Sequence, residues 1–163
     1  TTLHNAGVQS GDVVGLLAHN IPEFPITLFA IWYLGGTVLL LDTNLTPFEY
    51  DNMTKTVGCK FVCAEKSFFY KSKNFKFFDI NTKDDKADAR IKPVKTSADD
   101  IATLSFTSGS TGNPKVVPLT HGNLKTSLTQ KQTRHILITI FALSSDGTTF
   151  TQLHLHHSLQ VLM

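Results

Sequence analysis

The chain has 163 residues, of which 41% are hydrophobic and 17% are charged, and its formal net charge is +2 at pH 7. This length and composition suit one modest domain with its own core and exclude a disordered or fibrous chain. Lysines and arginines gather mostly over residues 55–95, with acidic residues among them. That mixture is typical of a solvated face more than of a nucleic-acid-binding surface, so we expect no nucleic-acid partner.

The first quarter of the sequence predicts two buried strands with a helix between them. Residues 3–7 are typical of the last turn of a helix that a glycine ends. Residues 13–18 form a short apolar run of the kind seen in buried parallel strands. We expect a helix from residue 22 to about residue 34, which begins at a proline and ends at two glycines. Residues 37–41 predict the second strand.

Residues 26–41 form an uncharged stretch that is somewhat short for a membrane-spanning helix. Gly35 and Gly36 interrupt it. We therefore expect a buried helix followed by a buried strand, and no transmembrane segment.

The next segment predicts a helix with a capping box. Thr46 can cap, Pro47 fits the first helical position and Glu49 can complete the box, with Gly58 as the stop. Residues 60–64 and 75–80 predict two further short strands. This alternation of strands and helices indicates an α/β fold, layered and with mainly parallel strands.

The second half of the chain changes character at residue 81. Residues 81–99 are rich in Lys, Asp and Ala and predict an exposed linker. The later expected elements are a strand at 101–106, a strand at 116–119, a helix at 121–131, a polar turn at 144–149 and a strand at 150–155. We expect a single partial domain over 1–163, made of an α/β portion (1–80), the linker (81–99) and a phosphate-loop portion (100–163), truncated at both ends.

The two cysteines, Cys59 and Cys63, lie among apolar residues. Their spacing fits neither a Cys-x-x-Cys redox pair nor half of a usual zinc site, so we expect core thiols and a reducing compartment. No signal peptide is visible. We expect a cytoplasmic or organellar location, with the peroxisome among the organelles considered, and no secretion.

The most informative stretch reads Phe-Thr-Ser-Gly-Ser-Thr-Gly-Asn-Pro-Lys and covers residues 106–115. Glycines let a backbone turn tightly and approach a ligand closely. Backbone N–H groups and hydroxyls can donate to phosphate oxygens, and Lys115 adds a positive charge. The glycine-to-lysine spacing excludes a Walker A loop, and no Ser or Thr follows the lysine. The pattern predicts a polyphosphate-binding loop with these residues: Thr107, Ser108, Gly109, Ser110, Thr111, Gly112 and Lys115.

This ordered run closely resembles the phosphate-binding signature of the adenylate-forming enzymes, which include acyl-CoA synthetases, coumarate-CoA ligases, luciferases and peptide-synthetase adenylation domains. The resemblance extends over nearly the whole chain. The other stretches that carry it are Gly11–Phe24, Leu34–Asp42, Asp99–Ala102, Pro118–Leu124 and Leu155–Leu159. The His-His-Ser form at residues 156–158 looks most like fatty acyl-CoA synthetases.

Some positions depart from the family pattern. Val116 stands where the family usually has glycine after the loop lysine, and His154 stands where proline is common. Because valine does not easily take positive φ, the backbone after Lys115 is expected to differ from the family's. The turn over residues 41–44 also lacks a frequent proline. The family's acidic magnesium motif, its ribose-binding aspartate and its C-terminal lysine domain are not in this sequence.

The resemblance implies a two-step reaction. A carboxylic acid attacks the α-phosphate of ATP to give an acyl adenylate, and the thiol of coenzyme A then takes the acyl group. The loop would hold the β- and γ-phosphates, with Lys115 as a charge clamp helped by Mg²⁺. The implied partners are therefore ATP, Mg²⁺, coenzyme A and a small carboxylic acid, expected to be a fatty acid, together with the missing remainder of the large domain and the C-terminal domain.

The resemblance also implies that His157 lies beside the carboxylate and the adenylate. Without it, a half-buried histidine at a strand end is the simpler interpretation. Neighbouring histidines on a strand point to opposite faces, so His156 and His157 would not share an ion, and we expect no resident metal site. The alternatives left open are a non-catalytic nucleotide-binding or structural remnant, and an adenylation domain that serves a carrier protein. The chain alone is expected to be inactive.

Overall fold

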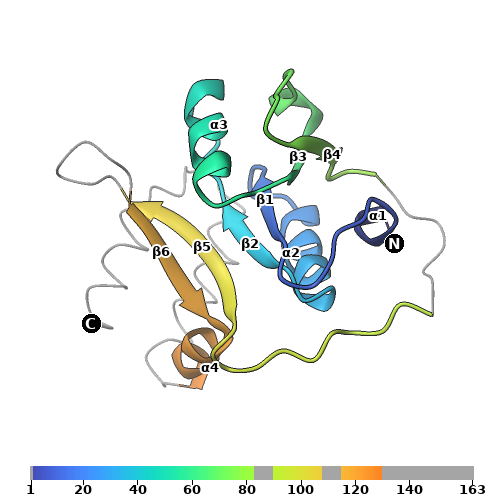
Figure 1. Ribbon diagram of the computed structural model, residues 1–163, viewed down its shortest axis with the longest axis vertical. Helices are drawn as coiled ribbons and strands as arrows, with labels where there is room; N and C mark the ends of the chain where they lie inside the picture. The colour runs from blue at the N-terminus through green and yellow to red at the C-terminus, as the bar shows by residue number, and fades with distance from the viewer. Residues whose placement is uncertain (1, 83–89, 108–114, 130–163) are drawn as a thin grey trace. The chain divides into compact units, whose positions relative to one another are not determined.

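The structure is a computed structural model that describes residues 2–82, 90–107 and 115–129 (Figure 1). The chain divides into two compact units, Thr1–Thr126 and Ser127–Met163, and the fold below is that of the first. The helices are α1 (Thr2–Asn5), α2 (Glu23–Tyr33), α3 (Pro47–Thr56) and α4 (His121–Thr129), with a 3-10 turn η1 (Lys66–Phe68). The strands are β1 (Val13–Leu17), β2 (Thr37–Leu40), β3 (Phe61–Ala64), β4 (Lys76–Asp79), β5 (Ile101–Thr107) and β6 (Lys115–Thr120).

The strands form one six-stranded sheet in the order β4-β3-β1-β2-β5-β6. All neighbours are parallel except β5 and β6, which pair antiparallel. The expected α/β fold with mainly parallel strands is therefore confirmed. The strands predicted at residues 13–18, 37–41, 60–64 and 75–80 all form, each within one residue of the expected ends. They were readable because strands buried on both faces are continuous apolar runs.

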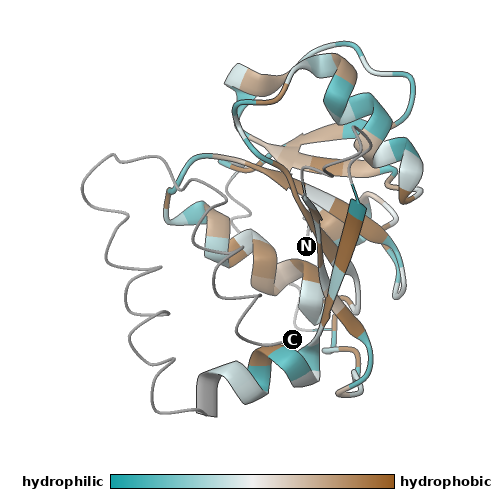
Figure 2. Cartoon of the chain, turned by 90° about the vertical axis from the view of Figure 1, so that its left-hand side faces the viewer, coloured by the Kyte–Doolittle hydropathy of each residue, from teal (hydrophilic) through white to brown (hydrophobic). Residues whose placement is uncertain are grey.

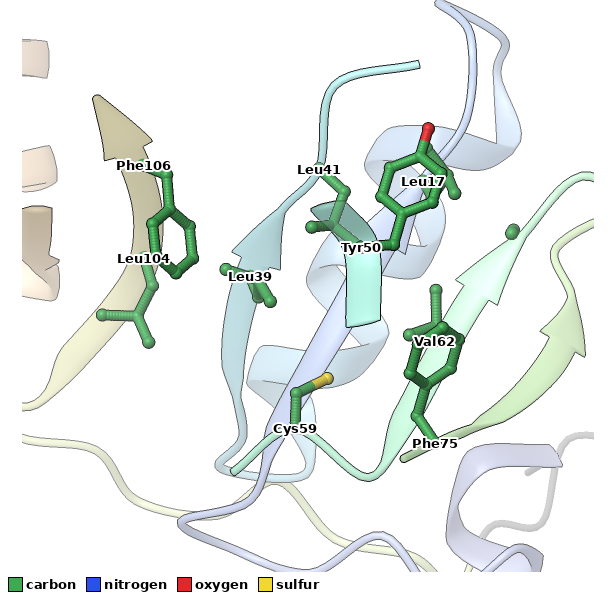
Figure 3. Close-up of a cluster of buried hydrophobic side chains, with 10 residues drawn as sticks. Leu17, Leu39, Leu41, Tyr50, Cys59, Val62, Phe75, Leu104 and Phe106 are labelled. Atoms are coloured by element: carbon green, nitrogen blue, oxygen red, sulfur yellow. The ribbon is translucent and has the colours of Figure 1, made fainter. Parts of the chain in front are cut away.

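Each face of the sheet carries its own hydrophobic core. On one face, Leu17, Leu39 and Val62 pack under Tyr50 of α3 (Figure 3). On the other face, Val14, Leu16 and Val38 pack under α1 and α2. Successive residues of a strand point to opposite faces, so one run of apolar residues supplies both cores. The result is the layered helix–sheet–helix arrangement.

Helix α2 is less buried than the sequence suggested. Only Ile31 is fully buried, whereas Ile26 is 66% and Phe29 59% exposed. The expectation of a buried helix over this stretch was wrong, because α2 covers the sheet with one stripe and turns an equally apolar stripe outward. Figure 2 shows this hydrophobic colouring on α2 as well as on the strands. In the described part of the chain, no helix is long and apolar enough to cross a membrane.

Helix α3 begins as the sequence predicted. The backbone N–H of Glu49 donates to the Thr46 hydroxyl at 3.4 Å, and the Glu49 carboxylate accepts from the Thr46 backbone N–H at 2.7 Å. That backbone N–H, followed by the Thr46 hydroxyl, holds the pKa of Glu49 below its ordinary value. The capping box is thus confirmed, and it fixes where the chain leaves β2 and enters α3.

We expect Thr46→Ala to lower the free energy of unfolding by about 1 kcal/mol, since it removes the acceptor for an end N–H of α3. Chemical denaturation monitored by circular dichroism measures this. Thr56→Ala, which removes a hydroxyl that bonds Asn52 in the last turn of the same helix, is the matched control. An equal loss in both variants would contradict a specific role of the cap.

The two thiols are free and buried, as expected. Burial raises the pKa of Cys59 from 9.0 to about 11 and that of Cys63 to about 12. In the unfolded chain the thiols ionise near their ordinary pKa, whereas in the folded chain they stay protonated. Rising pH above about 9 therefore favours the unfolded state.

Accordingly, the free energy of unfolding should be flat between about pH 6 and pH 8 and fall from about pH 9 upward. Urea unfolding across this range measures the decline. Replacing both thiols, Cys59→Ala with Cys63→Ala, should flatten it between about pH 9 and 10. Burial also raises the pKa of Tyr50, to about 12, and that of Tyr70, so both tyrosines add to the decline from about pH 10 upward. An unchanged slope in the double variant would contradict the assignment.

Residues 90–99 form no helix or strand and are mostly exposed. The segment is nevertheless attached to the end of α2. The Tyr33 hydroxyl donates to the carbonyl of Ile91 at 3.1 Å, and the Val94 N–H donates to the carbonyl of Tyr33 at 2.9 Å. These two bonds hold the segment beside α2 before the chain enters β5 (Figure 1).

Candidate phosphate-loop site

The two ends of the predicted phosphate loop lie side by side. Strands β5 and β6 form a hairpin in which Thr107, the last residue of β5, pairs with Lys115, the first residue of β6. Antiparallel partners of this kind lie about 4.5–5.5 Å apart. Thr107 is half-buried and Lys115 is exposed. The hairpin therefore brings the first hydroxyl and the lysine of the motif to one end of the sheet.

Strand β5 is held firmly at its start. The indole N–H of Trp32 donates to the carbonyl of Ala102 at 2.8 Å, and the Thr37 hydroxyl donates to the carbonyl of Ile101 at 2.9 Å. Ala102 is completely buried. Both bonds reach across from α2 and β2, so they fix β5 against the parallel part of the sheet.

The end of β5 is anchored by apolar packing. Leu104 and Phe106 project into the core that Leu39 also lines (Figure 3), and Phe106 is only 5% exposed. Phe106 directly precedes Thr107. The last rigid side chain of the core therefore sets the direction in which the motif leaves the sheet.

Val116 continues β6 in ordinary extended pairing. It lies opposite Phe106 and packs against the same core. Among the described residues, only glycines have positive φ. The valine in place of the family's glycine thus continues the regular strand that Lys115 begins, and its side chain adds to the packing under the motif.

The strand-to-helix step after β6 is fixed by reciprocal bonds. Asn123 accepts from the Thr120 backbone N–H at 3.0 Å, and the Asn123 N–H donates to the Thr120 hydroxyl at 3.1 Å. The ring of His121 lies edge-on to Trp32, with centroids 5.3 Å apart. A Cβ on Gly122 would lie 2.9 Å from the carbonyl oxygen of Ala98, so the chain passes too closely there for a side chain. The helix predicted at 121–131 is confirmed over His121–Thr129.

The turn after β2 lies at the same edge of the sheet, since parallel strands share their carboxyl ends. The carboxylate of Asp42 accepts from both the backbone and the side-chain nitrogen of Asn44, each at 2.9 Å. The Tyr50 hydroxyl donates to the Asp42 carbonyl at 2.9 Å. This network shapes the turn without the proline that is frequent there in the family.

Sequence reasoning missed a second pair of polar residues at this edge. Both the backbone N–H and the ring Nδ1 of His19 lie within hydrogen-bond distance of Glu65 Oε1, at 2.7 and 2.8 Å. The two residues follow β1 and β3, which are neighbours in the sheet. The signal was available, because a polar residue right after each of two buried strands lies at the carboxyl edge. The neighbouring order of β1 and β3 was not readable from the sequence.

Several predicted site residues lie outside the described part of the chain: Ser108, Gly109, Ser110, Thr111, Gly112 and His157. The strand expected at 150–155 and the turn at 144–149 also lie outside it. Within residues 2–82, 90–107 and 115–129, no three His, Cys, Asp or Glu residues gather as metal ligands would.

The comparison with protein families shows to which family the chain belongs. The family described as AMP-binding enzyme matches residues 1–163 of the chain. The chain belongs to this family. Among curated members, 4-coumarate:CoA ligase 1 of Petunia hybrida is 31% identical over 147 residues, and 4-coumarate--CoA ligase 1 of Arabidopsis thaliana is 30% identical over 152 residues. These alignments cover 79% and 78% of the chain but only 27% of each relative.

Solved structures of AMP-binding enzymes agree with the fold. O-succinylbenzoate coenzyme A synthetase of Bacillus subtilis in complex with AMP superposes with a TM-score of 0.66 at 28% identity, over 77% of this chain and 34% of that one. The same enzyme with a product analogue gives a TM-score of 0.69 at 27% identity and covers 91% of this chain. A nonribosomal peptide synthetase, FmoA3, shares the fold at 23% identity.

Proposed function

We propose that this chain supplies the polyphosphate-holding part of an enzyme that uses ATP to activate a carboxylic acid as its adenylate and then passes the acyl group to coenzyme A. The observation that carries the proposal is the pairing of Thr107 with Lys115 in the β5–β6 hairpin, which brings the two ends of the motif together. The chain that holds this hairpin belongs to the AMP-binding family. Because the chain spans only 27% of its curated relatives, the full reaction is assigned to a longer protein.

In the first step, negative charge grows on the departing pyrophosphate. Hydroxyl and backbone donors that are already in position stabilise that charge without reorganising. Lys115, exposed at the start of β6, is free to turn toward a β- or γ-phosphate that lies beyond Thr107. His157 is proposed to lie beside the carboxylate, on the strength of the family resemblance alone.

Two observations bear on the class of carboxylic acid, and they favour different classes. The His-His-Ser stretch favours a fatty acid, whereas the curated relatives at 30–31% identity are named for coumarate, an aromatic acid. The synthetase of Bacillus subtilis is named for succinylbenzoate, also aromatic. A panel of fatty and aromatic acids separates the two classes.

The test is nucleotide binding by the 163-residue chain, followed by ATP–pyrophosphate exchange over the acid panel. We expect ATP and inorganic triphosphate to bind better than AMP, since the motif addresses the β- and γ-phosphates. We expect no acid-dependent exchange by this chain. Equal affinity for ATP and AMP would overturn the assignment of the motif. Strong exchange would show that the chain needs no further parts, and the acid that drives it would identify the substrate class.

A further inference from the structure

Strand β5 of the hairpin contains one residue more than the facing part of β6. Ile101 lies opposite Thr120, and Thr103 lies opposite Leu119. Two steps along β5 therefore match a single step along β6, which is the geometry of a β-bulge. Ala102 is the surplus residue, and it is completely buried. A bulge shifts the register of every pair that follows it, so its effect reaches the far end of the hairpin.

The bulge decides which residues meet beside the phosphate motif. Beyond it, Phe106 lies opposite Val116 and Thr107 lies opposite Lys115. A ladder continued from the first pair without a surplus residue would instead set Lys115 opposite Phe106, in the place of Val116. Residues that lie directly opposite each other share a face of the sheet, and Phe106 faces the core. Without the bulge, the lysine would therefore point into the core and away from the face of Thr107.

The two ends of the hairpin are fixed independently of each other. At the open end, where β5 begins and β6 ends, the N–H groups of His121 and Gly122 donate to carbonyls of the segment before β5, at 3.0 and 2.7 Å. Figure 1 shows α4 at this end. At the motif end, Phe106 and Val116 pack in the core. Both ends can keep their positions only if the surplus residue is accommodated between them.

Trp32 of α2 holds this surplus residue in place. Its indole N–H donates to the carbonyl of Ala102 at 2.8 Å. A bulged residue is left out of the ladder, and a buried carbonyl without a donor is costly. The indole is itself positioned by edge-on contacts with the rings of Phe29 and His121, at 5.5 and 5.3 Å between centroids. A side chain from outside the hairpin thus stabilises the bulge.

From this geometry we infer that Trp32 is a positioning residue for the phosphate motif. Its N–H group stabilises the bulge at Ala102, and the bulge keeps Lys115 outside the core and on the same face as Thr107. Trp32 acts only through the register of the hairpin and is assigned no contact with phosphate. The inference rests on the proposed function, since it takes the motif to bind the phosphates of ATP.

The experiment removes the N–H group and keeps the shape of the ring. Trp32 is the only tryptophan of the chain, so expression with benzothienylalanine replaces it by an isostere that has sulfur in place of N–H. We expect ATP to bind about five- to tenfold more weakly in titration calorimetry, because the aligned hairpin is then only partly populated. Hydrogen exchange of the amides from Thr103 to Thr107 should also become faster, while the amides of β1 and β3 keep their rates.

Two matched controls separate the register of the hairpin from the stability of the chain. 5-Fluorotryptophan keeps the N–H group, so a chain that contains it should bind ATP as the original chain does. Ile31→Val removes a methyl group from a fully buried neighbour of Trp32 in α2. It should lower the melting temperature but leave the affinity for ATP unchanged. Thermal melts verify that every chain is folded at the temperature of the titrations.

Three results would overturn the inference. The first is an unchanged affinity for ATP in the isostere. The second is faster exchange only at Thr120 and His121, because the open end would then yield in place of the motif end. The third is an equal loss of ATP affinity in Ile31→Val, since stability alone would account for it.

Failure of the original chain to bind ATP would contradict the proposed function, and hydrogen exchange distinguishes the two failures. Faster exchange at Thr107 and Lys115 in the isostere would still support the control of the register by Trp32. Unchanged exchange at these two residues would overturn it.

Discussion

Lys115→Ala should weaken the binding of ATP by the chain about ten- to a hundredfold. The substitution removes one charge but leaves the hairpin and the hydroxyls of the motif in place. A hydrogen bond to a charged group is worth about 1.5–3 kcal/mol, which corresponds to this range of affinity. Titration calorimetry with ATP measures the loss.

Two comparisons make the Lys115 result specific. AMP lacks the β- and γ-phosphates, so its affinity should hardly change in the variant. Lys125→Ala removes an exposed lysine from α4 and should leave ATP binding as it was. If AMP binding falls as much as ATP binding, Lys115 contacts a part of the nucleotide that AMP also has. That result would contradict its proposed contact with the β- and γ-phosphates.

Phe106→Ala should lower the free energy of unfolding by about 3–5 kcal/mol, since it empties a ring-sized space in the core beside Leu39 and Leu104. It should also weaken ATP binding in the molecules that stay folded, because Thr107 loses the anchor that precedes it. Urea unfolding and titration below the unfolding transition measure the two effects separately.

The control for Phe106 lies on the same strand. Ile101 is 43% exposed at the start of β5, and Ile101→Ala should cost only about 0.5 kcal/mol or less. Phe106→Leu keeps most of the apolar volume and should recover a large part of the stability. If stability fell sharply while ATP affinity stayed constant, the core would not position the motif.

Local signals in the sequence predicted the local structure well. The continuous apolar run at Val13–Leu17 and the Thr46–Glu49 pair each have a physical meaning that depends only on neighbouring residues, and both are confirmed. The expected helix over α2 also forms, but its degree of burial was wrong. Burial depends on what lies above the helix, and an apolar stripe on its outer side looks the same in sequence as one on its inner side.

Contacts between distant residues were beyond such reasoning. Trp32 bonds Ala102, and His19 meets Glu65, only because of the order in which the strands assemble. Nothing near Trp32 in the sequence identifies its acceptor. For the candidate site, the motif and its lysine were predicted by residue type and spacing, whereas the closure of its two ends by pairing of β5 with β6 required the structure.

The same strand, β5, takes part in two very different kinds of pairing. Its partner β6 is a near neighbour in sequence, with Phe106 opposite Val116, whereas its partner β2 lies far away, with Leu39 opposite Leu104. A local hairpin closes in about 1–10 μs, but joining distant parallel strands is slower because a long stretch of chain must first be ordered. During synthesis and refolding, we therefore expect β5 to pair with β6 first. The finished hairpin, which carries the phosphate motif, would then dock onto β2 in a later step.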